Sequence, residues 1–162
     1  MNAPWKEAKY IHPENLKRKR EEIRKEGKTI ATLNGSFDLV HVGHLQIMHE
    51  ASKQADYLLI ALNSDNSIKK YKHSSRPFIT LEHRLQLVAA LQFVDFVTHF
   101  DEVDPCEILE KIQPNVHVNG SEYGDQCVEA KIVKKYGGTV HIVQLLPFCS
   151  TTHLIDKIKL CV

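Results

Sequence analysis

Short apolar runs alternate with segments of helical periodicity from residue 29 to the end of this 162-residue chain. The helical segments place apolar residues three or four positions apart, whereas the apolar runs have the length and composition of buried strands. The predicted strands are residues 29–33, 57–62, 94–98, 115–118 and 139–145, and the predicted helices are residues 44–54, 80–91, 105–112, 125–136 and 151–159. Because strands that alternate with helices pair in parallel, we predict an α/β fold, a doubly wound five-stranded parallel sheet with helices on both faces.

The length of the chain fits one main domain. With 43% hydrophobic residues, it can bury one core and is too short for two ordinary domains. Residues 1–28 are more polar, and the spacing of Leu16 and Ile23 predicts a surface helix from Pro13 to Glu26. We therefore expect an N-terminal helical extension over residues 1–28 and the main domain over residues 29–162.

Charge and hydropathy argue against two classes of partner. The formal net charge is +1, and the basic run at residues 17–20 is flanked by glutamates, so we interpret it as a solvated helix face. The longest apolar run, Tyr57 to Leu62, has the length of a strand and not of a membrane span. We therefore predict no nucleic-acid partner and no membrane partner.

The cysteines indicate a reducing compartment. None of the four forms a Cys-x-x-Cys pair, so neither a zinc ribbon nor a redox motif is indicated. The chain shows no export signal, which favours a cytoplasmic location over a secreted protein with disulfides.

The segment from Thr32 to His44 joins the first predicted strand to the first predicted helix of the main domain. The first amide groups of a helix lack partners and favour anions, and Gly35 and Gly43 allow close approach of a phosphate group. His41 and His44 are three residues apart, so both imidazoles point to one side. We therefore interpret the segment as a phosphate-binding corner. A histidine-rich polar loop is the plainer alternative, and zinc is a weaker one because no third ligand follows at a recognised spacing; we expect no protein-bound metal site.

Two parts of this corner carry a family resemblance, Asn34-Gly35-Ser36-Phe37-Asp38 and His41-Val42-Gly43-His44. They resemble the signature of the cytidylyltransferase-like nucleotidyltransferases, and the chain from about Gly27 onward is most similar to the bacterial D-glycero-D-manno-heptose 1-phosphate adenylyltransferases. The resemblance implies a Rossmann-like fold and a nucleotidyltransferase domain over residues 29–162. It also implies transfer of AMP from ATP to that sugar 1-phosphate with release of pyrophosphate, which gives ADP-heptose for lipopolysaccharide core synthesis.

Further segments match the same family where the predicted strands end. Asn63-Ser64-Asp65, the lysines that follow it, Ser75-Arg76-Pro77 and Glu82-His83-Arg84 come after the second strand, and Cys149-Ser150-Thr151-Thr152 opens the last helix. The segment Asn119-Gly120-Ser121-Glu122-Tyr123 keeps Gly120 and Tyr123 but departs from the family's usual Lys-Gly-Gly-Asp-Tyr. His73 stands where the family usually has glycine. These departures bear on the substrate more than on the reaction.

Residue roles follow from the resemblance and from position after the strands. Catalytic roles are expected for His41, His44 and Lys69. Nucleotide contacts are expected from Asn34, Gly35, Ser36, Phe37, Asp38, Gly43, Asn119, Gly120, Ser150, Thr151 and Thr152. Contacts to the acceptor or its phosphate are expected from Asn63, Asp65, Lys72, Arg76, Arg84, Glu122 and Tyr123. The resemblance also implies a nucleoside triphosphate and a small sugar phosphate as ligands, Mg²⁺ bound with ATP, and a homodimer.

Several alternatives stay open at the level of sequence. The lysines at 69 and 72 could belong to an exposed basic loop, and Ser150 could simply cap a helix. The enzyme could instead be a cytidylyltransferase that acts on glycerol 3-phosphate or another polyol phosphate. A non-catalytic nucleotide-sensing domain is the alternative from another class, because a fold does not dictate a function.

Overall fold

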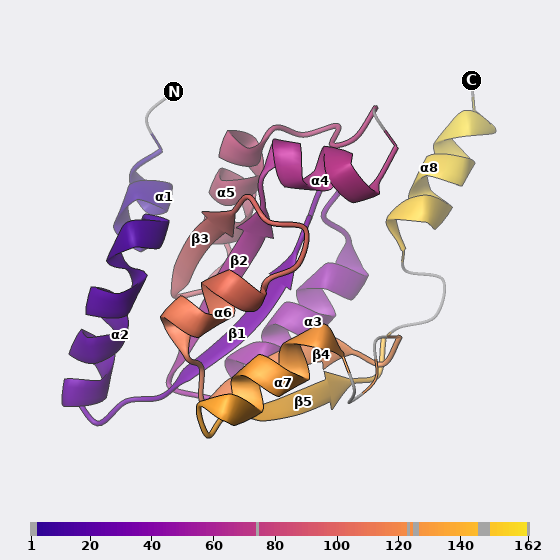
Figure 1. The fold of residues 1–162 in the computed structure, drawn as a ribbon. Coiled ribbons are helices and arrows are strands. Elements are labelled where there is room, and N and C mark those ends of the chain that lie inside the picture. The colour runs from indigo at the N-terminus through magenta and orange to yellow at the C-terminus, as the bar shows by residue number, and fades with distance from the viewer. Residues whose placement is uncertain (1–2, 74, 123, 125–126, 146–149, 162) are drawn as a thin grey trace.

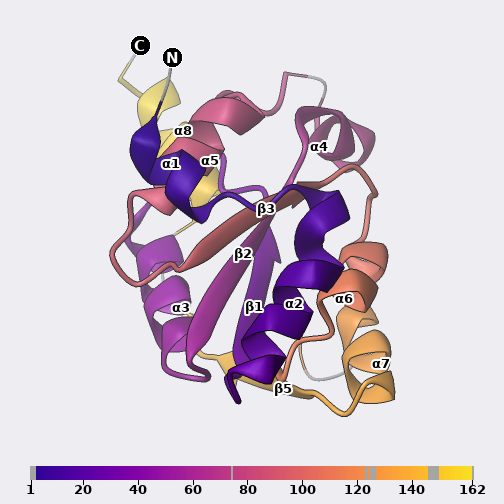
Figure 2. The same cartoon turned by 90° about the vertical axis from the view of Figure 1, so that its left-hand side faces the viewer.

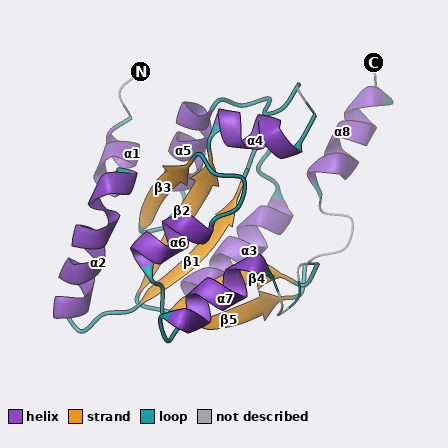
Figure 3. Cartoon of the chain, viewed as in Figure 1, coloured by secondary structure: helices purple, strands orange, loops and turns teal. Residues whose placement is uncertain are grey.

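The computed structural model describes residues 3–73, 75–122, 124, 127–145 and 150–161. Five parallel strands form one sheet in the order β3-β2-β1-β4-β5, as Figure 1 and Figure 3 show. This arrangement confirms the predicted α/β fold. The strands are β1 (Ile30–Gly35), β2 (Tyr57–Asn63), β3 (Phe96–Phe100), β4 (Val116–Gly120) and β5 (Thr139–Val143).

The helices follow the predicted alternation, with two additions. The segment predicted as one helix from Pro13 to Glu26 is a short 3-10 helix, η1, followed by α2. Two short helices, α1 and α4, were not predicted. The helices are α1 (Pro4–Lys9), η1 (Pro13–Asn15), α2 (Leu16–Lys25), α3 (Val42–Ser52), α4 (Asp65–Tyr71), α5 (Leu81–Ala89), α6 (Cys106–Ile112), α7 (Val128–Lys135) and α8 (Thr151–Lys159).

Helices cover the sheet on both faces (Figure 2). On one face, Leu33 and Leu62 pack with residues of α3 and α5, whereas on the other face Leu59 and Ala61 pack with residues of α2, α6 and α7. Successive residues of a strand point to opposite faces, so a strand buried on both sides must be apolar throughout. β2 accordingly has six consecutive buried residues. This leaves the carboxyl ends of the strands as the place where polar groups can face a ligand.

The N-terminal residues cover one edge of the sheet. The backbone N–H of Ile11 donates to the carbonyl of Val97 in β3 (2.9 Å), and Lys6 pairs with Glu82 of α5 at 3.1 Å. Ile11, together with Leu16 on α2, is buried in the same core as the sheet. The boundary at residue 28 between an N-terminal extension and the main domain stays a prediction. In the structure, buried residues on both sides of this boundary belong to one core.

The last helix, α8, stands apart from the two helical layers (Figure 1). It has no buried residue among those described, and Leu160 beyond it is 86% exposed. Its N-terminus, in contrast, is well formed, because the Ser150 hydroxyl accepts a hydrogen bond from the His153 amide (3.1 Å). The helix thus contributes to the structure mainly through its first turn. Within the described residues, no helix is both long and apolar enough to cross a membrane.

A buried polar pair links the two central strands. The Thr32 hydroxyl of β1 lies 2.8 Å from Nδ1 of His117 in β4, and both side chains are fully buried. Nδ1 and the hydroxyl satisfy each other, but Nε2 of His117 has no partner. Burial lowers the pKa of His117 to about 4, so the ring is neutral at pH 7.

We predict that His117 makes stability depend on pH. Its pKa is about 4 in the folded chain and 6.5 ordinarily, so between these values the unfolded chain binds more protons and stability falls as pH falls. The contribution reaches at most about 1.4 kcal/mol per pH unit. Urea unfolding of His117→Asn should show a shallower loss of stability from pH 7 to pH 5 than wild type. The exposed His83→Asn serves as control, and equal slopes in all three proteins would contradict the assignment.

Candidate active site

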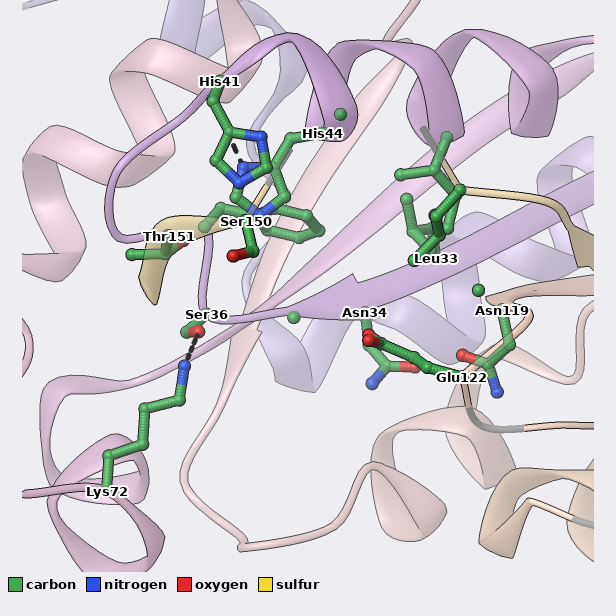
Figure 4. Close-up of a pocket in the computed structure, with 16 residues that line it drawn as sticks. Leu33, Asn34, Ser36, His41, His44, Lys72, Asn119, Glu122, Ser150 and Thr151 are labelled. Atoms are coloured by element: carbon green, nitrogen blue, oxygen red, sulfur yellow. Dashed lines mark hydrogen bonds between the residues drawn. The ribbon is translucent and has the colours of Figure 1, made fainter. Parts of the chain in front are cut away.

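A cavity of about 240 Å³ opens where the sheet order reverses between β1 and β4. Its wall combines the carboxyl ends of both strands with the first turns of α3 and α8 and with a lysine that follows α4 (Figure 4). This is the position at which doubly wound sheets bind ligands. The lining residues are Leu33, Asn34, Gly35, Ser36, Phe37, His41, Gly43, His44, Ile47, Lys72, Asn119, Gly120, Glu122, Leu145, Ser150 and Thr151.

Two stacked imidazoles form one side of this cavity. His41 is the N-cap of α3 and His44 lies in its first turn, and their ring centroids are 3.8 Å apart. The Phe37 and His44 rings pack edge to face, with their centroids 5.3 Å apart. The His41 backbone N–H donates to Nδ1 of His44 at 3.4 Å. Nδ1 of His41 is buried without a partner. The structure thus brings both predicted histidines to one place, with a free polar atom beside them.

Both imidazoles are neutral at pH 7. Burial lowers the pKa of His41, and burial together with the nearby His41 and Lys72 lowers the pKa of His44 to about 4. A neutral imidazole can donate one hydrogen bond to an anion without bringing a full charge. The pair is therefore suited to a group whose charge is already balanced by other cations.

The backbone of this corner depends on a glycine. Phe37 adopts a left-handed conformation with φ of 45°, which turns its ring back over the preceding strand end. A Cβ atom at Gly35 would lie 3.0 Å from that ring, which is too close for ordinary contact. A side chain at position 35 would therefore force the Phe37 ring to shift, and glycine avoids this where the chain leaves β1.

Lys72 is the lysine of this site. Its Nζ donates to the Ser36 hydroxyl at 2.8 Å, and burial together with nearby Arg76 lowers its pKa. Lys69, which was expected to be catalytic, is exposed on α4 and lines neither this cavity nor the one described below. The catalytic role of Lys69 stays a prediction, since the residue lies outside both cavities. Because α4 ends at Tyr71, the extended backbone at Lys72 directs that residue to a different side.

Arg84 and Asp65 were expected to bind the acceptor, which stays a prediction; in the structure they form an ion pair in which Arg84 is buried and the Asp65 side chain is 33% exposed. The guanidinium is 0% exposed and donates to the carbonyls of Ser36 (2.6 Å) and Asn63 (2.8 Å), and to the Asp65 carboxylate (2.7 Å). A fourth hydrogen bond runs to the Ile79 carbonyl at 2.9 Å. Every nitrogen of Arg84 is thus used within the protein, so its role is to position the strand ends.

Asp38 was expected to contact the nucleotide, which stays a prediction; in the structure its side chain is buried and anchors the segment that contains Phe78 and Ile79. Its carboxylate is 1% exposed and accepts hydrogen bonds from the backbone amides of Phe78 (3.0 Å) and Ile79 (2.8 Å) and from Nε of Arg76 (2.5 Å). Burial alone would raise the pKa of Asp38, but these donors outweigh it and lower the pKa. Arg76 is thereby held on Asp38, and its Nη2 atom is buried without a partner.

The other expected residues fall into three groups. Most of the nucleotide set lines the cavity, including Asn119, and so does Glu122, which was expected to contact the acceptor. Thr152 is exposed and lines neither this cavity nor the one described below, so its contact with the nucleotide stays a prediction. Tyr123, which was expected to contact the acceptor, lies outside the described residues, as does Cys149 of the matching segment.

A second cavity, of about 470 Å³, adjoins the first on the α6 and α7 side of the sheet. The two share the wall formed by Asn34, Gly35, Ser36, Lys72 and Asn119. Of the residues that line only this second cavity, the sequence analysis predicted a ligand contact for Asn63 alone. The others could have been found from their position, since several of them follow strands β3 and β4. The remaining lining residues are Asn63, Tyr71, Phe100, Val103, Asp104, Pro105, Cys127, Val128 and Glu129.

A family model described as cytidylyltransferase-like matches residues 32–157. The chain belongs to the cytidylyltransferase-like family. This assignment confirms the predicted family and its nucleotidyltransferase class, and it agrees with the histidine corner at the end of β1.

Curated relatives align with most of this chain. It is 40% identical over 146 residues to the bifunctional protein HldE of Syntrophotalea carbinolica, an alignment that covers 90% of this chain and 30% of that protein. The corresponding protein of Geotalea uraniireducens is 42% identical over 134 residues, covering 82% of this chain and 27% of its own length. The chain therefore spans about 30% of the length of these relatives.

Solved structures share the fold. The lipopolysaccharide core biosynthesis protein of Thermoplasma volcanium is 26% identical, with a TM-score of 0.60 over 74% of this chain and 98% of that one. A pantoate-β-alanine ligase from Francisella tularensis has a TM-score of 0.61 at 14% identity, over 93% of this chain and 77% of the other. The second likeness shows the fold alone.

We predict that Lys72 matters more to nucleotidyl transfer than Lys69. Lys72→Ala removes the cation that both cavities share and should lower turnover on the order of tenfold or more, whereas Lys69→Ala should change it less. Steady-state pyrophosphate release measures both. A greater loss in Lys69→Ala than in Lys72→Ala would contradict the placement of these lysines.

Proposed function

We propose that this protein transfers AMP from ATP to a sugar 1-phosphate, D-glycero-D-manno-heptose 1-phosphate, and releases pyrophosphate. The observation that carries the proposal is the stacked pair of neutral histidines at the start of α3, which faces a cavity closed by the first turn of α8. The similarity to HldE proteins and to a lipopolysaccharide core biosynthesis protein supports a sugar phosphate as acceptor. The product would be ADP-heptose.

The reaction needs no nucleophile from the protein. A phosphate oxygen of the sugar 1-phosphate attacks the α-phosphorus of ATP, a new P–O bond forms, and the bond from the α-phosphorus to the bridging oxygen breaks. Pyrophosphate leaves with that oxygen and its electron pair. Because the attacking group is already an anion, the protein has to orient the two phosphates and balance their charge.

The residues divide this task. His41 and His44 donate hydrogen bonds to the α-phosphate, and the free amides at the start of α3 support the same group. Ser150 and Thr151, at the start of α8, hold the β- and γ-phosphates with their hydroxyls. Lys72 lies on the wall between the cavities and neutralises the phosphates that meet there.

The two cavities fit the two substrates of such a reaction. In our proposal the nucleotide occupies the cavity of about 240 Å³ beside the histidines, and the sugar phosphate occupies the neighbouring cavity of about 470 Å³. Their shared wall, at Ser36 and Lys72, is then where the acceptor phosphate approaches the α-phosphorus. Direct transfer requires such a common boundary.

Magnesium would come with the nucleotide. Among the described residues, no group of three or more histidine, cysteine, aspartate or glutamate side chains is placed to hold a metal ion. Phosphate oxygens would therefore supply most of the ligands, and Glu122 is a carboxylate on the cavity wall that could add one. When bound, the ion neutralises charge on the phosphates.

A cytidylyltransferase that acts on glycerol 3-phosphate or another polyol phosphate is the second candidate. Asn119 and Glu122, which depart from the heptose family pattern, both line the nucleotide cavity. A changed loop in that wall could alter the base or the acceptor without touching the histidine corner. The homodimer and the cytoplasmic location stay predictions.

We predict that His44→Ala lowers turnover on the order of a hundredfold or more while the fold stays intact, because a preorganised contact to the α-phosphate is lost. Circular dichroism checks the fold, and pyrophosphate release measures the rate. His141→Ala, on strand β5 and outside the cavities, is the control. Near-normal turnover in a folded His44→Ala protein would remove the histidine from the mechanism.

The test of the whole proposal crosses ATP and CTP with heptose 1-phosphate, glycerol 3-phosphate and other phosphorylated sugars. We expect ATP with heptose 1-phosphate to give the highest kcat/KM. If CTP serves at least as well, or if no nucleotide sugar forms from heptose 1-phosphate, the assignment of substrates fails. Product identity is checked by mass spectrometry, since pyrophosphate release alone does not identify the acceptor.

A further inference from the structure

The larger cavity contains a carboxylate that the mechanism above does not use. Glu129, in the first turn of α7, lines this cavity and is only 7% exposed. No lysine or arginine of the described chain forms an ion pair with it. The Cys127 thiol donates one hydrogen bond to this carboxylate, and a carboxylate has about four acceptor positions, so it can accept further hydrogen bonds from a ligand in the cavity.

A complementary group lies beside this carboxylate. Burial raises the pKa of the Cys127 thiol. Two neighbouring side chains also shift this pKa, because Glu129 raises it further and Asn119 lowers it. Both side chains are therefore close to the same sulfur atom. Asn119 is 5% exposed, and its Nδ2 atom is buried without a partner. One wall of the cavity thus presents a hydrogen-bond donor and a hydrogen-bond acceptor side by side.

The cavity is also electrically polarised. Lys72 lies on the wall that it shares with the nucleotide cavity, whereas Glu129 and the exposed Asp104 lie toward α6 and α7. Lys72 and Glu129 do not form an ion pair with each other. A molecule with an anionic phosphate at one end and neutral hydroxyls at the other matches this charge distribution.

We propose that Glu129 determines acceptor specificity by accepting hydrogen bonds from hydroxyl groups of the sugar, with Nδ2 of Asn119 donating to a hydroxyl oxygen. The proposal rests on the proposed function for placing the acceptor in this cavity. Glu129 also repels a second anionic group at this end, so acceptors that carry one there are excluded. The sugar therefore enters with its phosphate toward Lys72.

The neighbours of Glu129 favour hydroxyls over an ammonium group. A hydroxyl both donates and accepts, so it can satisfy the Glu129 carboxylate and the Asn119 amide together. An ammonium group only donates, and the unpartnered Nδ2 of Asn119 would face it with another donor. The paired arrangement therefore fits a polyhydroxylated acceptor.

The test measures binding separately from turnover. Isothermal titration calorimetry with heptose 1-phosphate and other hexose 1-phosphates is carried out on wild type, Glu129→Gln, Glu129→Ala and the control Glu107→Gln, whose carboxylate lies on the exposed surface of α6. We expect both Glu129 variants to weaken sugar phosphate binding on the order of tenfold or more, as for a lost charge-assisted hydrogen bond. ATP binding should be unchanged in all of them.

Monodeoxy sugar phosphates then identify the hydroxyl. One monodeoxy sugar phosphate should bind wild type more weakly than the unmodified sugar phosphate does. The same two ligands should bind Glu129→Ala equally well, because this variant lacks the carboxylate that the hydroxyl contacts. Unchanged sugar binding in both Glu129 variants, or no binding of any sugar phosphate to wild type, overturns the proposal. An amino sugar phosphate that binds more tightly through Glu129 overturns the hydroxyl assignment. If wild type binds sugar phosphates through Glu129 yet releases no pyrophosphate, the proposed function fails and this inference stands.

Discussion

The buried guanidinium of Arg84 holds the active-site end of the sheet together. It joins the end of β1 at Ser36, the end of β2 at Asn63 and the segment at Ile79 by hydrogen bonds of 2.6 to 2.9 Å, with Asp65 as counter-ion. Without it, three backbone carbonyls and one carboxylate would lack a common partner at the point where two strands separate. Because removal of the buried guanidinium would leave these carbonyl groups without their hydrogen-bond donor, the geometry of both cavities depends on this one side chain.

The fold could be predicted from the sequence because strands and helices each impose a regular spacing on the apolar residues. Apolar runs such as residues 57–62 and the helical segments between them predicted the sheet and its two covered faces, and the family assignment agrees with it. Boundaries were off by a few residues, and α4 was missed because Asp65–Tyr71 is short and mostly polar, so its apolar period spans barely two turns. The histidine corner was found because its strand, glycine and helix order has a local physical meaning.

The roles of charged residues were less accessible. Asp38, Asp65 and Arg84 were assigned to ligands because a charged side chain after a strand end usually faces solvent or substrate, and sequence does not show which charges pair with each other inside the protein. That Lys72 lines both cavities and Lys69 lines neither has a similar origin, since it depends on where α4 stops. Burial and pairing are tertiary properties, and local pattern does not report them.

Lys72 lies on the boundary of both cavities, and this has a thermodynamic consequence. In the proposed function, one positive charge faces two phosphate-bearing ligands, which repel each other when they occupy separate sites. The lysine attracts both ligands and so offsets part of this repulsion in the ground state. When the acceptor oxygen closes on the α-phosphorus, the negative charge becomes concentrated beside the same lysine. The lysine would then stabilise the transition state more than the ground state, which is the condition for binding energy to appear as rate.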